Sequence, residues 1–148
     1  MFVVDPNNEV FSEAEKEDIN QAVKNAEIDS SCEFKVHVDR QCKEDTAKRS
    51  EELFYKLGVD KTEGHNGILF YAVLDCRKFI IQTDKALKNT LPEGFWDDIY
   101  HIMLVNFRKG HYALGLSEAV QKAGEKLKPY YPWLKDDRNE VSDDISIG

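Results

Sequence analysis

The stretch that decides the fold reads Gly67-Ile68-Leu69-Phe70-Tyr71-Ala72-Val73-Leu74. It is the longest uninterrupted apolar run of the chain, and polar residues close it at Asn66 and at Asp75. A strand that lacks polar alternation is buried on both faces, as happens at the centre of a sheet covered by helices. The stretch therefore predicts the central strand of an α/β fold.

A β-rich segment follows this strand almost at once. Residues 77–83 contain Phe79, Ile80 and Ile81, and only a short turn at residues 75–77 separates them from the central strand. A connection of this length allows only an antiparallel hairpin.

A second strand and a helix precede the central strand. In residues 34–39, Phe, Val and Val alternate with Lys, His and Asp, which predicts a strand with one buried face. Residues 45–57 form a helical pattern that ends before Gly58, a common helix stop. The order strand, helix, strand predicts a βαβ crossover with two parallel strands.

Helices account for most of the remaining chain. Ser12 with Glu15 three residues later predicts a capped helix from about Ser12 to about Glu27. After the hairpin, helical spacing predicts a short helix near 85–89 and longer ones at about 94–108 and 112–128. The pattern predicts a small mixed sheet with helices on both faces.

Composition and charge limit the class of protein. A chain of 148 residues fits one domain, and we expect residues 1–134 to form it, followed by an acidic, flexible tail at 135–148. The net charge of −8 argues against nucleic acid and anionic membranes as partners. The start of the chain has no signal-peptide pattern, and no apolar run could insert into a membrane.

The three cysteines show no metal-binding spacing, and their odd number indicates reduced thiols. We therefore expect a cytoplasmic monomer.

Motifs for covalent catalysis are missing from the sequence. None of the cysteines has an Arg six residues later, and the central strand delivers Asp75 but no second Asp two residues on. The patterns of serine hydrolases, zinc proteases and nucleotide-binding loops are also missing. The sequence offers no obvious catalytic nucleophile.

Oxygen ligands recur where the predicted strands begin and end. Glu33 opens the first strand, Asn66 precedes the central strand, and Asp84 ends the hairpin partner. Strand directions bring these three to one edge of the sheet and place Asp75 at the opposite end. Such oxygens suit Ca²⁺ or Mg²⁺, but Asp and Asn are also common caps of strands and turns. The spacing alone leaves both interpretations open.

The order of these segments resembles the TPM-domain family over residues 11–147, in the form that lacks membrane segments. The resemblance is carried by Phe11-Ser12, Ser31-Cys32-Glu33-Phe34-Lys35-Val36, His65-Asn66-Gly67-Ile68-Leu69-Phe70, Asp75-Cys76-Arg77-Lys78-Phe79, Asp84, Phe95-Trp96, Phe107-Arg108-Lys109-Gly110 and Asp136-Asp137-Arg138-Asn139-Glu140. The chain departs from the family where Cys32, Thr83 and Ala86 replace glycines.

This resemblance implies a three-layer α/β/α sandwich and a divalent cation, Ca²⁺ ahead of Mg²⁺, held by Glu33, Asn66, Asp75 and Asp84. We expect a cation-binding, non-catalytic domain. The first alternative is a metal-dependent acid phosphatase that acts on phosphomonoesters. The second is an interaction module, with another protein as partner, in membrane-protein maintenance.

Overall fold

The computed structural model of the chain describes residues 10–132 and 145–147. Its helices are α1 (Glu13–Asp29), α2 (Thr46–Lys56), α3 (Lys85–Thr90), α4 (Asp97–Arg108) and α5 (Tyr112–Leu127), with a 3₁₀ turn, η2 (Val59–Lys61). Its strands are β1 (Glu33–Asp39), β2 (Gly67–Val73), β3 (Lys78–Thr83) and β4 (Ser146–Ile147).

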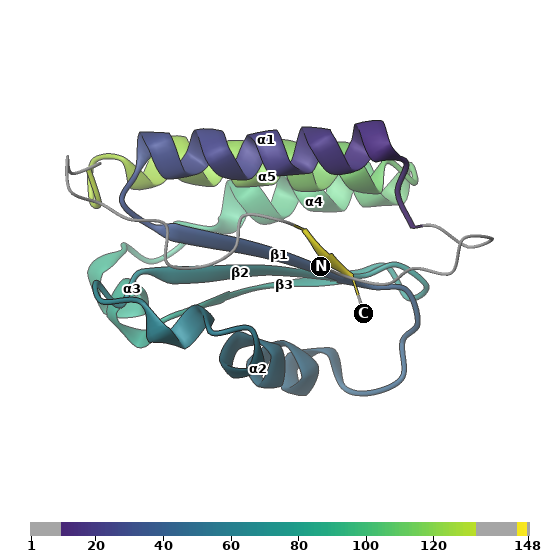
Figure 1. The fold of residues 1–148 in the computed structure, drawn as a ribbon, viewed down its shortest axis with the longest axis horizontal. Helices are drawn as coiled ribbons and strands as arrows, with labels where there is room; N and C mark the ends of the chain where they lie inside the picture. Colours follow the sequence, from purple (N-terminus) through teal and green to yellow (C-terminus); the bar gives the residue numbers. More distant parts are fainter. Residues whose placement is uncertain (1–9, 133–144, 148) are drawn as a thin grey trace.

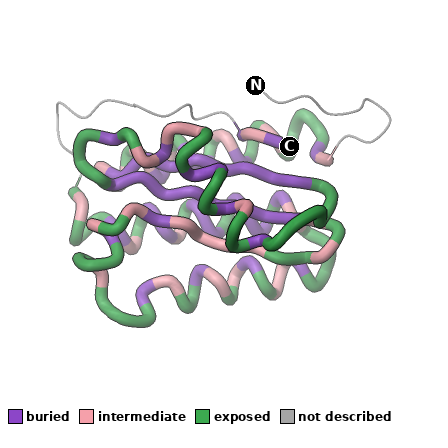
Figure 2. Tube along the Cα trace, turned by 90° about the horizontal axis from the view of Figure 1, so that it is seen from below, coloured by how far each residue is buried: buried purple, intermediate pink, exposed green. Residues whose placement is uncertain are grey.

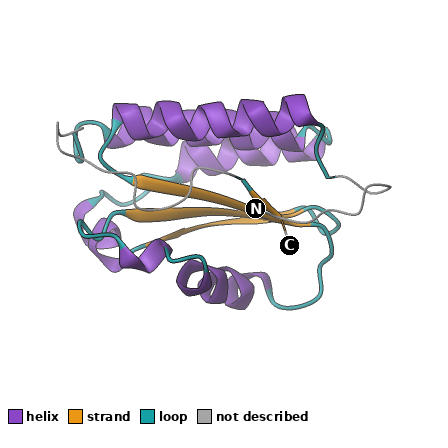
Figure 3. Ribbon diagram, in the orientation of Figure 1, coloured by secondary structure: helices purple, strands orange, loops and turns teal. Residues whose placement is uncertain are grey.

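The four described strands form one mixed sheet in the order β3-β2-β1-β4. β1 runs parallel to β2 and to β4, whereas β2 and β3 form the antiparallel hairpin. Helices α1, α4 and α5 cover one face of the sheet, and α2 covers the other (Figures 1 and 3). The predicted α/β/α sandwich and the βαβ crossover are therefore confirmed.

Local signals place the helix ends where the sequence predicts them. At the start of α1, the Ser12 hydroxyl accepts a hydrogen bond from the Glu15 amide at 3.1 Å, and the Glu15 carboxylate accepts one from the Ser12 amide at 2.9 Å. After α2, Gly58 has a φ of 75°, the left-handed conformation that glycine adopts without steric cost. Both ends follow from local hydrogen bonding and backbone freedom.

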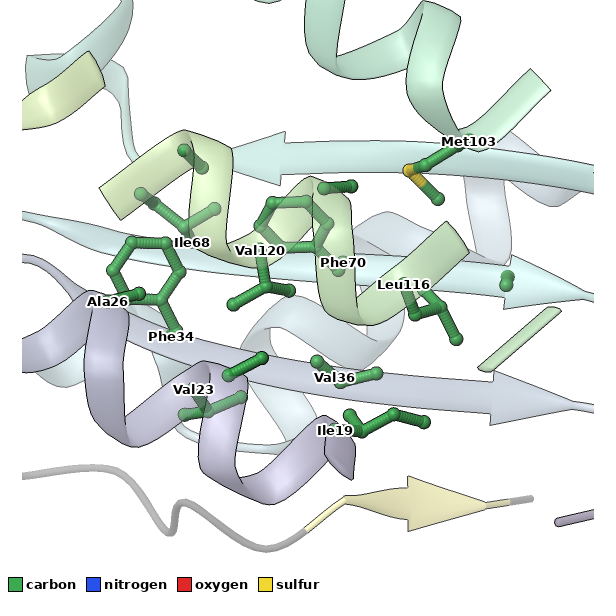
Figure 4. Close-up of a cluster of buried hydrophobic side chains, with 14 of the residues drawn as sticks. Ile19, Val23, Ala26, Phe34, Val36, Ile68, Phe70, Met103, Leu116 and Val120 are labelled. Atoms are coloured by element: carbon green, nitrogen blue, oxygen red, sulfur yellow. The ribbon is translucent and has the colours of Figure 1, made fainter. Parts of the chain in front are cut away.

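β2 supplies side chains to two apolar clusters. Ile68 and Phe70 belong to the large cluster between the sheet and the layer of α1, α4 and α5 (Figure 4), while Leu69 and Tyr71 belong to a smaller one under α2. All seven residues of β2 are buried, which confirms the central strand. Burying one large apolar side chain stabilises a fold by roughly 1.5–3 kcal/mol, so this strand is a major source of stability.

β1 differs from its prediction, because neither of its faces is open to water. All seven of its residues are buried, including Lys35, His37 and Asp39. Figure 2 shows this burial from the side of α2. The prediction of one solvated face was wrong: Arg49 of α2 and Tyr71 of β2 bond to Asp39, and the Tyr71 ring also packs against His37.

Two of the three cysteines form a disulfide, Cys42–Cys76, and Cys32 is buried with a free thiol. The prediction of three reduced thiols was therefore wrong. Paired residues of β1 and β2, such as Asp39 and Val73, are 34 positions apart, and the two bridged cysteines are separated by the same 34 positions. The parallel register thus carries them to adjacent places beyond the strands. Disulfides persist mainly in oxidising compartments, so the cysteine count no longer supports a cytoplasmic location.

The C-terminal end of the chain contributes to the sheet. Ser146–Ile147 pair with His37 and Val38 of β1 as strand β4, in the region predicted as an acidic tail. The acidic residues at 136–144 and the predicted boundary at 134/135 lie outside the described residues. Within the described ranges, no helix has the length and apolar character needed to span a membrane.

Candidate functional site

Three of the four predicted ligands meet at one edge of the sheet, where β1 and β2 begin and β3 ends. The Glu33 amide donates to the Asn66 carbonyl at 3.1 Å, and the Asp84 amide donates to the Gly67 carbonyl at 3.2 Å. Asp75 is exposed in the β2–β3 turn at the other end of β2, so the structure does not bring it to this group. We call Glu33, Asn66 and Asp84 the polar edge.

Gly67 fixes how closely the chain approaches this edge. A Cβ atom at this position would lie 2.1 Å from the carbonyl oxygen of Val59 in η2. Only glycine therefore lets η2 pack against the first residue of β2. This contact holds the segment that contains Asn66 against the sheet.

Asn66 is buried, and its side chain has one satisfied end and one unsatisfied end. Its Nδ2 group donates to the Ser31 carbonyl at 2.5 Å, which fixes the orientation of the amide. Its Oδ1 atom is buried and accepts no hydrogen bond from the described residues. A buried acceptor left without a donor costs about 1–3 kcal/mol. A cation or a water molecule at Oδ1 would remove this cost.

Asp84 has one oxygen occupied by the backbone and one turned toward a histidine. Its Oδ1 atom accepts a hydrogen bond from the Ala86 amide at 3.2 Å, as the N-cap of α3. Its Oδ2 atom lies 3.8 Å from Nδ1 of His65, an exposed residue with a φ of 50°.

The donor atoms of the polar edge are oxygens, which suits a hard divalent cation. Across residues 10–132 and 145–147, no three His, Cys, Asp or Glu side chains gather closely enough to form a metal site by themselves. A cation at this edge would therefore need the Asn66 amide oxygen and water to complete its coordination shell.

A second polar group, which sequence reasoning missed, lies on the α2 side of β1 near its carboxyl end. Asp39 is its centre: Oδ2 accepts hydrogen bonds from the Tyr71 hydroxyl at 2.5 Å and from Arg49 Nε at 3.0 Å. Oδ1 lies 3.0 Å from Nε2 of His37, and Nδ1 of His37 lies 2.8 Å from the Ser146 hydroxyl. These five residues form what we call the Asp39 network.

The Asp39 network keeps its carboxylate charged. Burial works to raise the pKa of Asp39, but hydrogen bonds from His37, Arg49 and Tyr71 outweigh it and hold the pKa well below its usual range. Burial and the hydrogen bond to Asp39 raise the pKa of Tyr71 well above its usual range. His37 therefore lies between Asp39 and Ser146, with Nε2 facing the carboxylate and Nδ1 facing the hydroxyl.

The order Ser146, His37, Asp39 is that of a nucleophile, a base and an orienting acid. Arg49 argues against a catalytic role for these three residues, because its guanidinium neutralises the Asp39 carboxylate that would otherwise support a positive charge on His37. Ser146 also sits in β4, where its hydroxyl helps to hold the strand. The arrangement is better suited to fixing β4 and α2 on β1 than to activating a serine.

Comparisons with known proteins support the fold and the family. The family model described as TPM domain matches residues 3–126. The NMR structure of the BA42 protein from the psychrophilic bacterium Bizionia argentinensis is 32% identical, with a TM-score of 0.89, and the match covers 95% of this chain and 97% of that one. The N-terminal domain of a P. gingivalis protein is 31% identical, with a TM-score of 0.66 and coverage of 82% and 79%. None of the curated proteins compared with the chain matches it.

Proposed function

We propose that this chain, which belongs to the TPM-domain family, binds a divalent cation at the polar edge. The observation that carries the proposal is the buried Oδ1 atom of Asn66, which accepts no hydrogen bond from the described residues. The Glu33 amide bonds to the Asn66 carbonyl and the Asp84 amide to the Gly67 carbonyl, so both residues bring a carboxylate to this end of the sheet. A cation would satisfy the amide oxygen and reduce the repulsion between the two carboxylates.

Ca²⁺ fits this donor set better than Mg²⁺. Ca²⁺ accepts six to eight oxygens in a flexible geometry, whereas Mg²⁺ requires a near-ideal octahedron. The polar edge offers two carboxylates and one amide, so much of the shell would be water. Sites with so few charged ligands bind Ca²⁺ with a Kd on the order of 10⁻⁴–10⁻³ M.

The expected role is structural. A bound ion would link the start of β1, the start of β2 and the junction between β3 and α3, three segments that hydrogen bonds already join. The ion would therefore strengthen an existing junction. A metal-dependent phosphatase, the alternative function, would need the same ion to polarise a phosphoryl oxygen and to activate a water molecule.

The test is a Ca²⁺ titration of the full chain, followed by amide chemical shifts. We expect saturable shifts at residues 31–33, 62–67 and 83–86, and weaker binding in Asp84→Asn. Asp75→Asn is the matched control, because it removes a similar charge at the opposite end of β2 and should leave binding unchanged. Shifts that do not saturate, or an equal loss in both variants, would contradict the proposal.

A phosphomonoester hydrolysis assay on the same samples distinguishes the structural role from the alternative function, a metal-dependent phosphatase. Binding without phosphate release supports the structural role. Phosphate release that requires Ca²⁺ or Mg²⁺ and disappears in Asp84→Asn would instead assign the phosphatase activity.

A further inference from the structure

The outer edge of β1 is occupied by a short segment from the far end of the chain. β4 makes only two register pairs with β1, His37 with Ser146 and Val38 with Ile147, whereas β1 and β2 make seven. Figure 1 shows β4, in yellow, alongside β1. The sheet thus ends on a strand with few backbone contacts.

Residues 145–147 are held by apolar contacts and by hydrogen bonds to two other parts of the domain. The side chains of Ile145 and Ile147 are 2% and 6% exposed and belong to the main apolar cluster. The Ile145 amide donates to the Asn20 side chain of α1 at 2.9 Å, and the Ser146 hydroxyl bonds to His37. The edge therefore selects an aliphatic, a hydroxyl and a second aliphatic residue in sequence.

The recognition of the hydroxyl depends on the Asp39 network. Asp39 lies 3.0 Å from Nε2 of His37 and orients the ring, so Nδ1 faces the strand edge, 2.8 Å from the Ser146 hydroxyl. Arg49 and Tyr71 hold Asp39 from the other side. This oriented ring nitrogen favours Ser or Thr at the position of Ser146 and disfavours an aliphatic residue, which would leave Nδ1 without a hydrogen-bond partner.

We propose that the outer edge of β1 is a strand-docking site for extended peptides with the pattern aliphatic, Ser or Thr, aliphatic, and that residues 145–147 fill it in cis. The free energy gained by burying two isoleucine side chains is offset by the conformational entropy lost when three residues become ordered. The cis segment therefore exchanges between a docked state and a state in which the edge of β1 is open. A partner protein that presents the same pattern docks in parallel to β1, by strand addition.

A free peptide must compete with residues 145–147 for the edge of β1. A ligand on the same chain acts at an effective concentration on the order of millimolar, so a free peptide binds the unaltered protein weakly. Weakening the cis segment should therefore reveal the site.

The experiment uses the full chain and a fluorescent peptide with the sequence of residues 143–148. In Ile145→Ser/Ile147→Ser, we expect peptide binding at least tenfold tighter than in the unaltered protein, with amide shifts at His37 and Val38. A peptide with Ser146 replaced by Ala should bind at least fivefold more weakly, and one with both isoleucines replaced by Ser should not bind. A folded variant that binds no peptide, or that binds all three equally, overturns the proposal.

Hydrogen exchange of the unaltered protein is a second test, which does not require that the Ile145→Ser/Ile147→Ser variant folds. The amides of Ile145 and Ile147 should exchange at least tenfold faster than those of the β2 centre, Leu69 to Tyr71. Equal protection would make β4 a permanent strand and would overturn the proposal. A concentration-dependent dimer that forms by exchange of residues 145–147 would assign the occupant to a second copy and would also overturn it.

Discussion

Removing the Cys42–Cys76 disulfide is expected to lower the free energy of unfolding by about 4 kcal/mol. The bridge closes a loop with a sequence separation of 34 residues. The chain-entropy relation for a loop of this length gives the value, because the open chain regains the conformations that the bridge forbids in the unfolded state. For a protein of this size, 1 kcal/mol corresponds to roughly 2–4 °C in Tm, so we expect Tm to fall by about 8–16 °C.

The assay is urea unfolding of the oxidised protein, of the protein in dithiothreitol, and of Cys42→Ser/Cys76→Ser. The reduced protein and the double variant should share one lowered midpoint, and the reductant should not affect the double variant further. A thiol titration of the denatured, non-reduced protein should find one reactive thiol, from Cys32.

Identical midpoints for the oxidised and reduced proteins would refute the reasoning, provided that the thiol titration shows the bridge is present. Three reactive thiols in the non-reduced protein would instead show that the bridge does not form.

Two further predictions concern the buried network and the helical layer. The folded pKa of Asp39 lies below its unfolded value of about 4, so its contribution to stability is present above about pH 4 and is lost as the pH falls below it. Asp39→Asn should therefore flatten the acid side of the stability profile in urea unfolding, and Asp39→Ala should cost about 3–5 kcal/mol at pH 7; an unchanged profile would contradict this. In α5, a Cβ at Gly124 would lie 2.6 Å from the Ala26 backbone, so Gly124→Ala should cost about 1–3 kcal/mol. Gly110→Ala is the comparison variant: the added Cβ would meet no neighbour within 4 Å, but Gly110 has a φ of 76°. Its cost therefore reports backbone strain without a steric contact.

The sequence by itself determined the main helices, the strands β1 to β3 and their order, but not β4. Gly67–Leu74 reads as a buried strand because its apolar run is continuous, and Ser12 and Gly58 mark helix ends because capping is a local interaction. The short link at residues 75–77 permitted only a hairpin. Strand direction alone also separated Asp75 from Glu33, Asn66 and Asp84, because β2 carries Asn66 and Asp75 at opposite ends.

The tertiary structure alone decided which distant residues meet. Lys35, His37 and Asp39 alternate as a solvated face would, but all three are buried, and no local pattern shows that Arg49 of α2 reaches across to Asp39. Ser146 reaches His37 across 109 positions, a pairing that no local pattern encodes. The disulfide is an intermediate case. Cys42 and Cys76 are 34 positions apart, and this spacing predicts their pairing only once the β1–β2 register, also 34 positions, is known. Periodicity and capping are properties of neighbouring residues, whereas the register of parallel strands and the docking of β4 are set by packing across the whole domain.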